Sequence, residues 1–546
     1  MRRSALNPPQ RASAPATQDR TTTDRENAMV LKLALALVSL FVLWGALAPD
    51  QLGATMQWLL TGVIARFGWF YLLTMFGFLV FALYLAFGRF GSIRLGGEDA
   101  EPQFHRLSWF SMLFAAGMGI GLVFWGVAEP VSHLIKPPQG LEPLTPQAAG
   151  TGLRYALFHW GLHPWAAYSV VALALAFFQF NRDRPMLIST TFEPLIGARA
   201  NGPLGKWIDV LALIATAFGV ATSLGLGALQ INAGLYRVFG VPNDIAVELI
   251  IIAVAGALYI LSSLSGLTRG IQWLSNLNMV LAVLLLLTVF VLGPTSFILD
   301  ALTTTIGAYL DNLIGMSMRM TPFSQGTWVA DWTLFYWAWW IAWAPFVGTF
   351  IARISKGRTI REFIVGVLLA PTLISFLWFG VFGGAGLYAS MFQNVPVVQA
   401  VQQDPSLALF ALLDAYPAAT LTSILAIVLV TVFFVTSADS ATFVLGMMSD
   451  HGNPRPPARL KLIWGVLIAL IAGVLLVSGG LKGLQSMSIL AALPFAVVMA
   501  AMCVSLFRAL DEESTRLERR HRARDRLLER LLRDRETQPP AGPPQD

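Results

Sequence analysis

The sequence is poor in charged residues and has almost no cysteine. Only 12% of the 546 residues are Asp, Glu, Lys or Arg, whereas soluble proteins carry about 25%. Hydrophobic residues make up 56%, and mean hydropathy is +0.64. This balance excludes a mainly soluble protein and indicates one polytopic, all-α membrane domain. The single Cys503 lies in an apolar run, which excludes a disulfide framework and a cysteine metal site.

Several catalytic motifs are also missing. The sequence has no G-x-x-x-x-G-K-[ST] loop for ATP, no HExxH motif and no GxSxG motif. We therefore expect neither an enzyme nor a cofactor, and any transport must take its energy from an ion gradient. The net charge of +6 does not indicate nucleic acid, because basic residues of membrane proteins gather in cytoplasmic loops.

Long apolar runs divide the chain into three parts. We predict a disordered polar tail over 1–28, a transmembrane domain over 29–507 and a charged, Arg-rich cytoplasmic helix over 508–546. Residues 300–330 are less apolar and predict a helix on the membrane surface rather than a further span. The twelve predicted spans are 29–48, 68–88, 109–127, 153–180, 207–231, 245–264, 273–297, 332–353, 362–390, 418–449, 459–478 and 484–507.

Charged loops give the expected orientation. Lys and Arg are concentrated in alternate loops, for example at Arg182, Arg184, Arg353, Lys356 and Arg358, and are sparse in the others. Because cytoplasmic loops are the basic ones, this pattern places both termini in the cytoplasm. Arginines and acids alternate in the C-terminal tail, which predicts either a solvated extension or a regulatory helix that touches anionic lipid or another subunit.

One stretch, 331–346 (DWTLFYWAWWIAWAPF), is unusually rich in aromatic residues. On an ideal helix a single face, about 100° wide, carries Trp332, Tyr336, Trp339, Trp340 and Trp343. Trp332 to Trp343 spans about 16 Å, which is half of a ~30 Å hydrocarbon core and too deep for an interfacial aromatic belt. Stacked aromatic faces suit a desolvated cation, above all a quaternary ammonium, which has no N–H to donate.

The third and fourth spans contain further unusual residues. Gly117, Gly119 and Gly121 alternate in the third span, which predicts either close helix packing or a locally unwound helix that meets a ligand. In the fourth span we expect Pro164 to kink the helix. The same span carries a second, separate aromatic group, Trp160, Trp165 and Tyr168.

Polar residues within spans leave alternatives open. His159 and His163 are four apart and are either a proton relay or hydrogen-bonded structural groups. In the tenth span a hydroxyl-rich cluster offers oxygen ligands for Na⁺ or interhelical hydrogen bonds; it consists of Thr436, Ser437, Asp439 and Ser440. Glu129 and Glu248 lie near span ends and are assigned no special role.

These motifs resemble the betaine/choline/carnitine transporter (BCCT) family over nearly the whole chain. The resemblance rests on GMGIG with WGVAEP, HWGLHPWAAY, FFVTSADS and the run Phe335 to Phe363, and it is greatest to the sodium-coupled glycine betaine and compatible-solute carriers. It implies a LeuT-type fold, in which helices 3–7 and 8–12 form a 5+5 inverted repeat after two N-terminal helices. It also implies a homotrimer in the lipid of the bacterial inner membrane.

The resemblance also implies residue roles. An aromatic box around a trimethylammonium group corresponds to Trp160, Trp165, Tyr168 and Trp340, with Trp343 as a neighbour and Trp337 and Trp339 as weaker candidates. Gly117, Gly119 and Gly121 match the unwound stretch near the substrate carboxylate. The principal sodium site of the sodium-coupled members matches Ala115, Met118, Phe433, Thr436 and Ser437.

Two positions bear on ion and substrate choice. Proton-coupled choline carriers have Asp where this chain has Gly121, so Gly121 favours Na⁺ and a zwitterion that brings its own carboxylate. Val220 stands where a second threonine, four after Thr216, is expected for a second sodium site. Our hypothesis is a Na⁺-coupled importer of glycine betaine or a related solute. The alternatives are a proton-coupled or exchange carrier for choline or carnitine, and a channel or membrane osmosensor.

Overall fold

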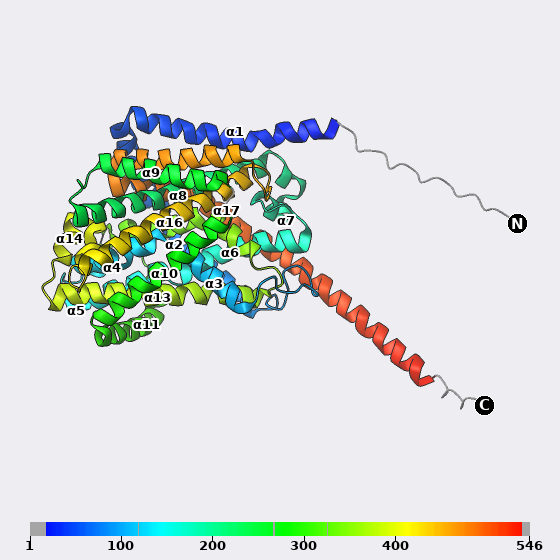
Figure 1. Ribbon diagram of the computed structural model, residues 1–546. Helices are drawn as coiled ribbons and strands as arrows, with labels where there is room; N and C mark the ends of the chain where they lie inside the picture. The colour runs from blue at the N-terminus through cyan, green and yellow to red at the C-terminus, as the bar shows by residue number, and fades with distance from the viewer. Residues whose placement is uncertain (1–17, 118, 266–267, 325, 538–546) are drawn as a thin grey trace.

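The computed structural model describes residues 18–117, 119–265, 268–324 and 326–537, and they form a bundle of helices (Figure 1). Within this described part there is no β-strand, and an isolated bridge joins Arg94 to Thr359. The all-α prediction is confirmed. The helices of the first half are α1 Gln18–Leu47, α2 Pro49–Phe87, α3 Arg106–Gly117, α4 Ile120–Ile135, α5 Pro146–Trp160, α6 Leu162–Arg182, α7 Glu193–Ile196, α8 Pro203–Phe239, α9 Ile245–Ser265 and α10 Thr268–Leu292.

The second half begins with α11 and contains the longest helix. Its elements are α11 Thr295–Ser317, the π-helical turn η4 Ala330–Leu334, α12 Phe335–Arg353, α13 Ile360–Phe392, α14 Val397–Gln403, α15 Ala408–Leu413, α16 Ala419–Ser449 and α17 Ala458–Thr537. Four short 3₁₀ turns complete the described chain, namely η1 Pro138–Gly140, η2 Ser189–Phe192, η3 Gly197–Asn201 and η5 Pro405–Leu407.

Ten helices of the described chain are long and apolar enough to cross a membrane, and they make this a multi-pass membrane protein. The predicted third span is absent from these ten because it is divided into α3 and the 16-residue α4. The last two predicted spans run together in α17, where the non-helical Gly480 (φ 55°, ψ −139°) marks the junction. The count of twelve and the inverted repeat stay predictions.

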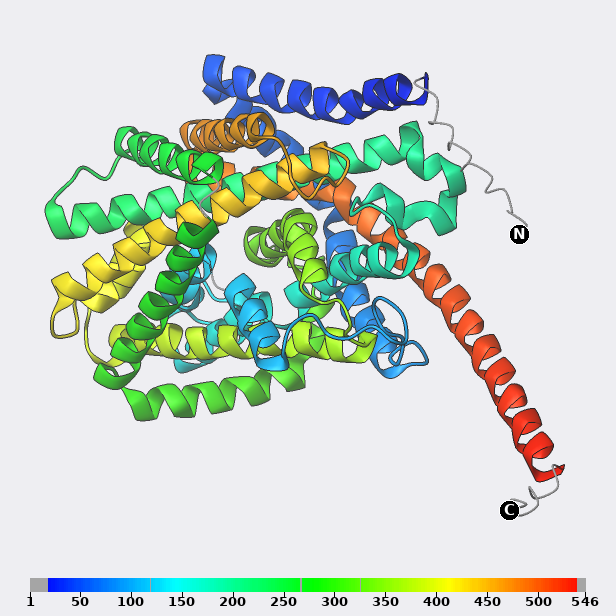
Figure 2. The same ribbon diagram turned by 45° about the vertical axis from the view of Figure 1, so that its right-hand side comes forward.

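α11 covers most of the segment expected on the membrane surface. It is not among the ten candidate spans. It lies at the edge of the bundle beside α13, at the end opposite to the one where α17 leaves (Figures 1 and 2). Its polar residues, including Asp300 and Asp311, account for its exclusion from the apolar interior.

Both ends of the described chain lie on the same side of the bundle, where α1 begins and α17 ends (Figure 1). α1 begins at Gln18, so helix extends into the predicted tail 1–28, because a helix elongates readily once its apolar part has formed. α17 continues from the last span through the predicted charged helix to Thr537, and residues 538–546 lie outside the described part.

The C-terminal part of α17 touches the bundle before it projects from it (Figure 2). Arg89 pairs with Asp511, Arg182 pairs with Glu512 at 3.3 Å, and His521 pairs with Glu98. These contacts hold the first turns of the tail against the loop after α2 and the end of α6. Beyond them the helix is exposed, including Leu527, Leu528, Leu531 and Leu532.

Candidate functional site

The third predicted span is broken in the middle of the bundle. α3 ends at Gly117, Gly119 is fully extended (φ −168°, ψ −178°), and α4 begins at Ile120. The span is thus locally unwound at Gly119, whereas Gly121 serves close packing. Met118 lies outside the described residues. The break exposes backbone groups beside Ala115 and Gly119, which both line the main cavity.

Gly121 is required by close packing. A Cβ atom there would lie 2.4 Å from Cη2 of Trp339 and 2.9 Å from Cη2 of Trp160. Real Cβ atoms do not approach other atoms so closely, so any side chain at this position would displace the two indole rings. The absence of a side chain at Gly121 therefore lets two tryptophans meet the first turn of α4.

The fourth predicted span is broken too, although not by Pro164. Its two parts, α5 and α6, meet at Gly161 (φ −93°, ψ −133°). Pro164 is the third residue of α6, where its missing N–H removes no intrahelical hydrogen bond. The break puts Trp160 at the end of one helix and Trp165 and Tyr168 in the first turns of the next.

The aromatic residues of α5, α6 and α12 form one continuous group rather than two separate ones. Trp160 meets Trp340 edge to face with ring centroids 4.8 Å apart, and Tyr168 meets Trp340 at 6.3 Å. Trp165 contacts Tyr168 at 5.3 Å. Trp343 lies one turn further along α12 and is partly exposed. We call Trp160, Trp165, Tyr168 and Trp340 the aromatic box.

The polar edges of the indole rings are bound to the protein. Trp340 donates its N–H to the carbonyl of His159 at 2.9 Å, and Trp343 donates to the carbonyl of Gly219 at 2.8 Å. Trp339 donates to Ser223 Oγ at 3.2 Å. With these donors used, the rings contribute mainly their π-faces and carbon edges to the cavity, which suits a cation without N–H groups.

A cavity of about 930 Å³ contains nearly all the predicted site residues. It is closed beside Gly121 and Trp160 and opens where Gln103, Arg353 and Ser440 are exposed. Every predicted substrate and sodium residue except Gly117 and Met118 lines it: Ala115, Gly119, Gly121, Trp160, Trp165, Tyr168, Trp340, Trp343, Phe433, Thr436 and Ser437.

The aromatic face predicted on the eighth span is shorter than expected. Trp339, Trp340 and Trp343 line the cavity, whereas Trp332 and Tyr336 do not. Trp332 lies in the π-helical turn η4, which changes the angle per residue and breaks the ideal α-helical phase. It packs against His133 with centroids 4.5 Å apart. Trp337 is buried and stacks on His163 at 5.2 Å, outside the cavity.

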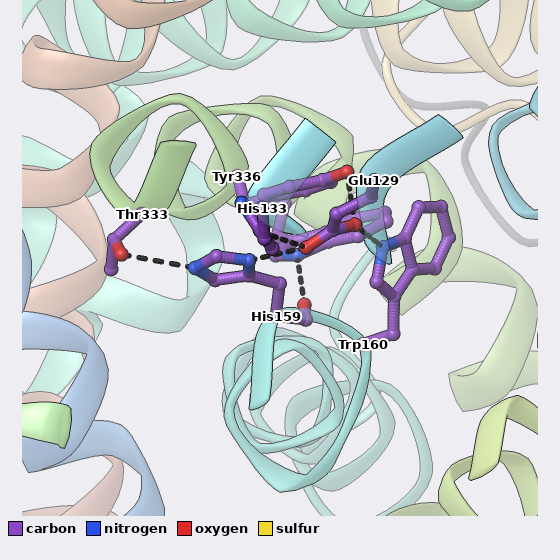
Figure 3. Close-up of polar contacts among 7 residues, drawn as sticks. Glu129, His133, His159, Trp160, Thr333 and Tyr336 are labelled. Carbon is purple, nitrogen blue, oxygen red and sulfur yellow. Dashed lines mark hydrogen bonds and ion pairs between the residues drawn. The ribbon is translucent and has the colours of Figure 1, made fainter. Parts of the chain in front are cut away.

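Glu129, to which the sequence analysis assigned no role, is the centre of a buried polar cluster (Figure 3). Its side chain has no exposed surface. Oε2 accepts from Trp160 Nε1 at 3.0 Å and from the Tyr336 hydroxyl at 2.5 Å. Oε1 lies 2.6 Å from His159 Nδ1 and 3.3 Å from His133 Nε2. That assignment was wrong: α4 continues beyond Glu129 to Ile135, so the carboxylate lies inside the bundle.

The two histidines of the fourth span are hydrogen-bonded within the protein. His159 bonds Glu129 and also Thr333, whose Oγ1 is 2.9 Å from Nε2 (Figure 3). His163 Nε2 lies 2.9 Å from Ser317 Oγ. The structural alternative for these residues is therefore supported. Glu129, His133 and His159 hold ligand atoms within 4.8 Å of one another, as a metal site would, but Trp160 and Tyr336 donate to the same carboxylate.

The predicted sodium residues of α16 face the cavity beside the break in the third span. Thr436 donates its hydroxyl to the carbonyl of Val432 at 2.9 Å and accepts from Asn278 Nδ2 at 3.1 Å. Asn278 is 3% exposed, and its Oδ1 has no partner among the described residues. The sequence analysis missed Asn278, for which the signal was an amide within the apolar seventh span.

Asp439 lies in the protein interior, as we expect because exposing a carboxylate to lipid is energetically unfavourable. It accepts from Ser262 Oγ at 3.3 Å, and the neighbouring Ser263 and Thr442 hydroxyls are 3.1 Å apart. Lys461 donates to the carbonyl of Ser263. At the possible second sodium site, Thr216 is buried and donates to the carbonyl of Ala212 in its own helix at 2.8 Å.

Comparisons with known proteins agree with this architecture. A sequence model of BCCT, the betaine/carnitine/choline family transporter, matches residues 29–515. The glycine betaine transporter OpuD of Bacillus subtilis is 50% identical over 493 residues, which cover 90% of this chain and 96% of that protein. The ectoine/hydroxyectoine transporter of Virgibacillus pantothenticus is 44% identical and covers 90% and 98%. A glycine betaine transporter of Acinetobacter baylyi is 42% identical and covers 91% and 75%.

Proposed function

This chain belongs to the betaine/carnitine/choline transporter family, and we propose that it imports glycine betaine or a related zwitterionic compatible solute with Na⁺ by alternating access. It is a multi-pass membrane transporter for betaine-type compatible solutes and not an enzyme. The proposal concerns the particular solute, the coupling ion and the residues that bind them.

One observation carries the choice of a quaternary ammonium. The aromatic box surrounds the closed end of the cavity, and the N–H groups of Trp160 and Trp340 point to protein acceptors. A trimethylammonium group attracts π-faces and offers them no hydrogen bond. With the N–H groups of these two rings bonded to the protein, Trp160 and Trp340 offer their π-faces to the cavity, which suits this group better than a primary amine.

The charge near the box supports a zwitterion over choline. Among the described residues that line the cavity, the acidic one is Asp439, which is near the open end with Lys461 and Ser263. The Glu129 carboxylate already accepts hydrogen bonds from Trp160 and Tyr336. Position 121, which faces Trp160 and Trp339, is a glycine and supplies no carboxylate to the box. A substrate that carries its own carboxylate needs no counter-charge here, whereas choline does.

Sodium coupling is supported by the oxygen atoms beside the box. Phe433, Thr436 and Ser437 on α16 line the same cavity as Ala115 on α3. We propose that Na⁺ binds between these two helices and stabilises the arrangement that accepts substrate. Thr436 would then exchange its contact with Asn278 for the ion.

We also propose a homotrimer in the bacterial inner membrane with both termini in the cytoplasm. The start of α1 and the end of α17 lie on the same side of the bundle, which supports a common location of the two termini (Figure 1). The cavity opens at Arg353, on the side that the basic loops place in the cytoplasm, so the structure is inward-facing in this proposal.

Uptake into proteoliposomes tests the function directly. Radiolabelled betaine, ectoine, proline, choline and carnitine are offered with an inward Na⁺ gradient, with a proton gradient and with K⁺ alone. We expect Na⁺-driven accumulation of betaine or ectoine and none of choline. Equal betaine uptake in K⁺ buffer would rule out sodium coupling, and proton-driven choline uptake would favour the alternative carrier.

Substitution in the box tests the binding site. Trp340→Leu removes a ring that faces the cavity, and we expect loss of betaine binding, measured by tryptophan fluorescence, with normal membrane insertion. Trp337→Leu is the matched control: it lies three residues earlier on α12, is buried, and packs on His163 outside the cavity. It should lower stability and keep betaine affinity. Unchanged affinity in Trp340→Leu would contradict the assignment.

A further inference from the structure

Glu129 joins the three helices that form the closed end of the cavity. It belongs to α4, while His159 and Trp160 end α5, and Tyr336 begins α12. All four of its donors are buried: His133, His159, Trp160 and Tyr336. A carboxylate accepts several hydrogen bonds and donates none, so it is the group that matches four convergent donors.

Hydrogen bonds connect both carboxylate oxygens of Glu129 to residues of the aromatic box or to residues that contact it. Oε2 receives the Trp160 indole N–H, which fixes the rotation of that ring against Trp340. The same oxygen receives the Tyr336 hydroxyl, and the Tyr336 ring stacks on Trp340 with centroids 6.0 Å apart and planes inclined by 21°. Oε1 is bonded to the His159 side chain, whose backbone carbonyl accepts the Trp340 N–H.

We propose that Glu129 is a positioning residue that sets the angle between Trp160 and Trp340 and so the affinity of the box for the ammonium group. It does not touch the cavity itself, since it is absent from the lining residues. The inference rests on the proposed function, because it presumes that the box binds a quaternary ammonium solute. It adds a determinant of affinity behind the residues that line the cavity.

Another buried carboxylate shows what a structural role alone looks like. Asp209 on α8 is 6% exposed and accepts from the backbone N–H of Ser189 at 2.9 Å and from its hydroxyl at 2.7 Å. These bonds fasten α8 to the turn η2, and no ring of the box takes part. Asp209→Asn therefore makes the same chemical change as Glu129→Gln at a site without a path to Trp160 or Trp340.

The test measures betaine affinity by fluorescence titration of the purified, full-length transporter. In Glu129→Gln one carboxylate oxygen becomes an NH₂ group, which cannot accept from two donors. We expect the betaine dissociation constant to rise roughly ten-fold or more, since hydrogen bonds to charged groups are the strong ones. In Asp209→Asn the dissociation constant should equal that of the wild type, even if thermal stability falls.

A double-mutant cycle separates positioning from general damage. Trp160→Phe keeps a ring and deletes its N–H, so adding Glu129→Gln to it should raise the dissociation constant by much less than in the wild-type background. Additive effects would overturn the inference, as would wild-type affinity in Glu129→Gln or an equal loss in Asp209→Asn.

Two single-donor variants keep the test decisive if Glu129→Gln does not fold. Tyr336→Phe and Trp160→Phe each remove one donor and leave the carboxylate intact, and each should weaken betaine binding. Wild-type affinity in both would overturn the inference. If the wild-type protein does not bind betaine at all, the proposed function is wrong and this inference with it. If the wild type binds and the variants bind equally well, only the inference is wrong.

Discussion

The two ends of the cavity differ in the burial of their polar groups. At the closed end, Glu129 is fully buried and is bonded to four buried side chains, although Nδ1 of His133 has no partner among the described residues (Figure 3). At the open end Arg353 and Ser440 are exposed, and elsewhere in the cavity wall the buried Asn278, next to Thr436, keeps an oxygen without a partner among the described residues. Buried groups bonded to one carboxylate hold the helices together, whereas polar groups exposed at the mouth of a cavity are in contact with water.

This difference bears on the proposed alternating-access cycle. In that cycle one end of the cavity closes before the other opens, so the hydrogen bonds around Glu129 would break in the opposite state. The hydrogen bonds there join α4, α5 and α12, and their loss must be offset by substrate or ion binding elsewhere. Substitutions and labelling at the two ends test this contrast, in decreasing order of the change that we expect.

Chemical labelling compares the two ends directly. In a Cys503→Ala background, Ser440→Cys places a thiol at the exposed mouth and Thr333→Cys places one beside His159, where the side chain is 2% exposed. A hydrophilic maleimide should label the first rapidly and leave the second nearly unlabelled. Comparable labelling rates, measured by mass spectrometry, would show that the end assigned as closed admits water.

Steric crowding of the box tests its close packing. Gly121→Ala puts a Cβ atom against Trp339 and Trp160, and overpacking of about 1–3 kcal/mol predicts a roughly ten- to hundred-fold loss of betaine affinity. Gly126→Ala is the control on the same helix. Its Cβ would lie 2.7 Å from Nε1 of Trp378, away from the cavity. It should lower melting temperature without changing betaine affinity; equal affinity losses would show that the box is not specifically affected.

Removal of one hydroxyl tests the proposed ion site beside the break in the third span. Thr436→Val keeps the shape of the side chain and deletes a proposed Na⁺ ligand, so half-maximal uptake should need roughly ten-fold more Na⁺. Thr431→Val, five residues earlier on α16, removes a hydroxyl that donates to the carbonyl of Ile427 at 2.8 Å. That variant should behave as the wild type. An unchanged Na⁺ dependence in Thr436→Val would exclude the hydroxyl as a ligand.

The smallest effect concerns the tail contact outside the membrane. The hydrogen bond from His521 lowers the pKa of the Glu98 carboxyl below its ordinary value. A lowered pKa means that the contact stabilises the docked tail while Glu98 is ionised, and that this stabilisation is lost as the pH falls through the carboxyl's own pKa. Because the pair is exposed, a spin label at Arg524 should show only a slight gain in mobility in acid. A mobility that is constant with pH would mean that the pair does not hold the tail.

Most of the predicted site residues line the cavity, some because they carry local signals in the sequence and others, such as Ala115 and Phe433, through the family resemblance. The glycines of the third span weaken the helix, which made a local break one of the two alternatives that the sequence left open. The tryptophans of α5 and α12 are identifiable by their rarity and spacing. Asn278 and Glu129 were not found in this way, because an isolated polar residue in an apolar run does not reveal its partners.

Glu129 illustrates what a single sequence omits. Its donors come from positions 133, 159, 160 and 336, so they are brought together only by the packing of three helices. The π-helical turn at Ala330–Leu334 had a similar consequence: it changed the position of Trp332 relative to the face that an ideal helix predicts. Tertiary contacts and a local change of helical pitch were the missing information.

Because α17 runs without a break from the last span into the tail, a tilt of that span would also move the tail. From Leu510 to Thr537 the helix is unbroken, which at 1.5 Å per residue is an arm about 40 Å long. If the last span tilts by about 10° during the cycle, the tip of that arm sweeps about 7 Å, several times the movement near the bundle. Ion pairs at Asp511 and Glu512 hold the arm near its base, and His521 pairs with Glu98 further along it. A small rearrangement inside the membrane is thereby amplified into a displacement that a fluorescent or spin probe at the tip can record.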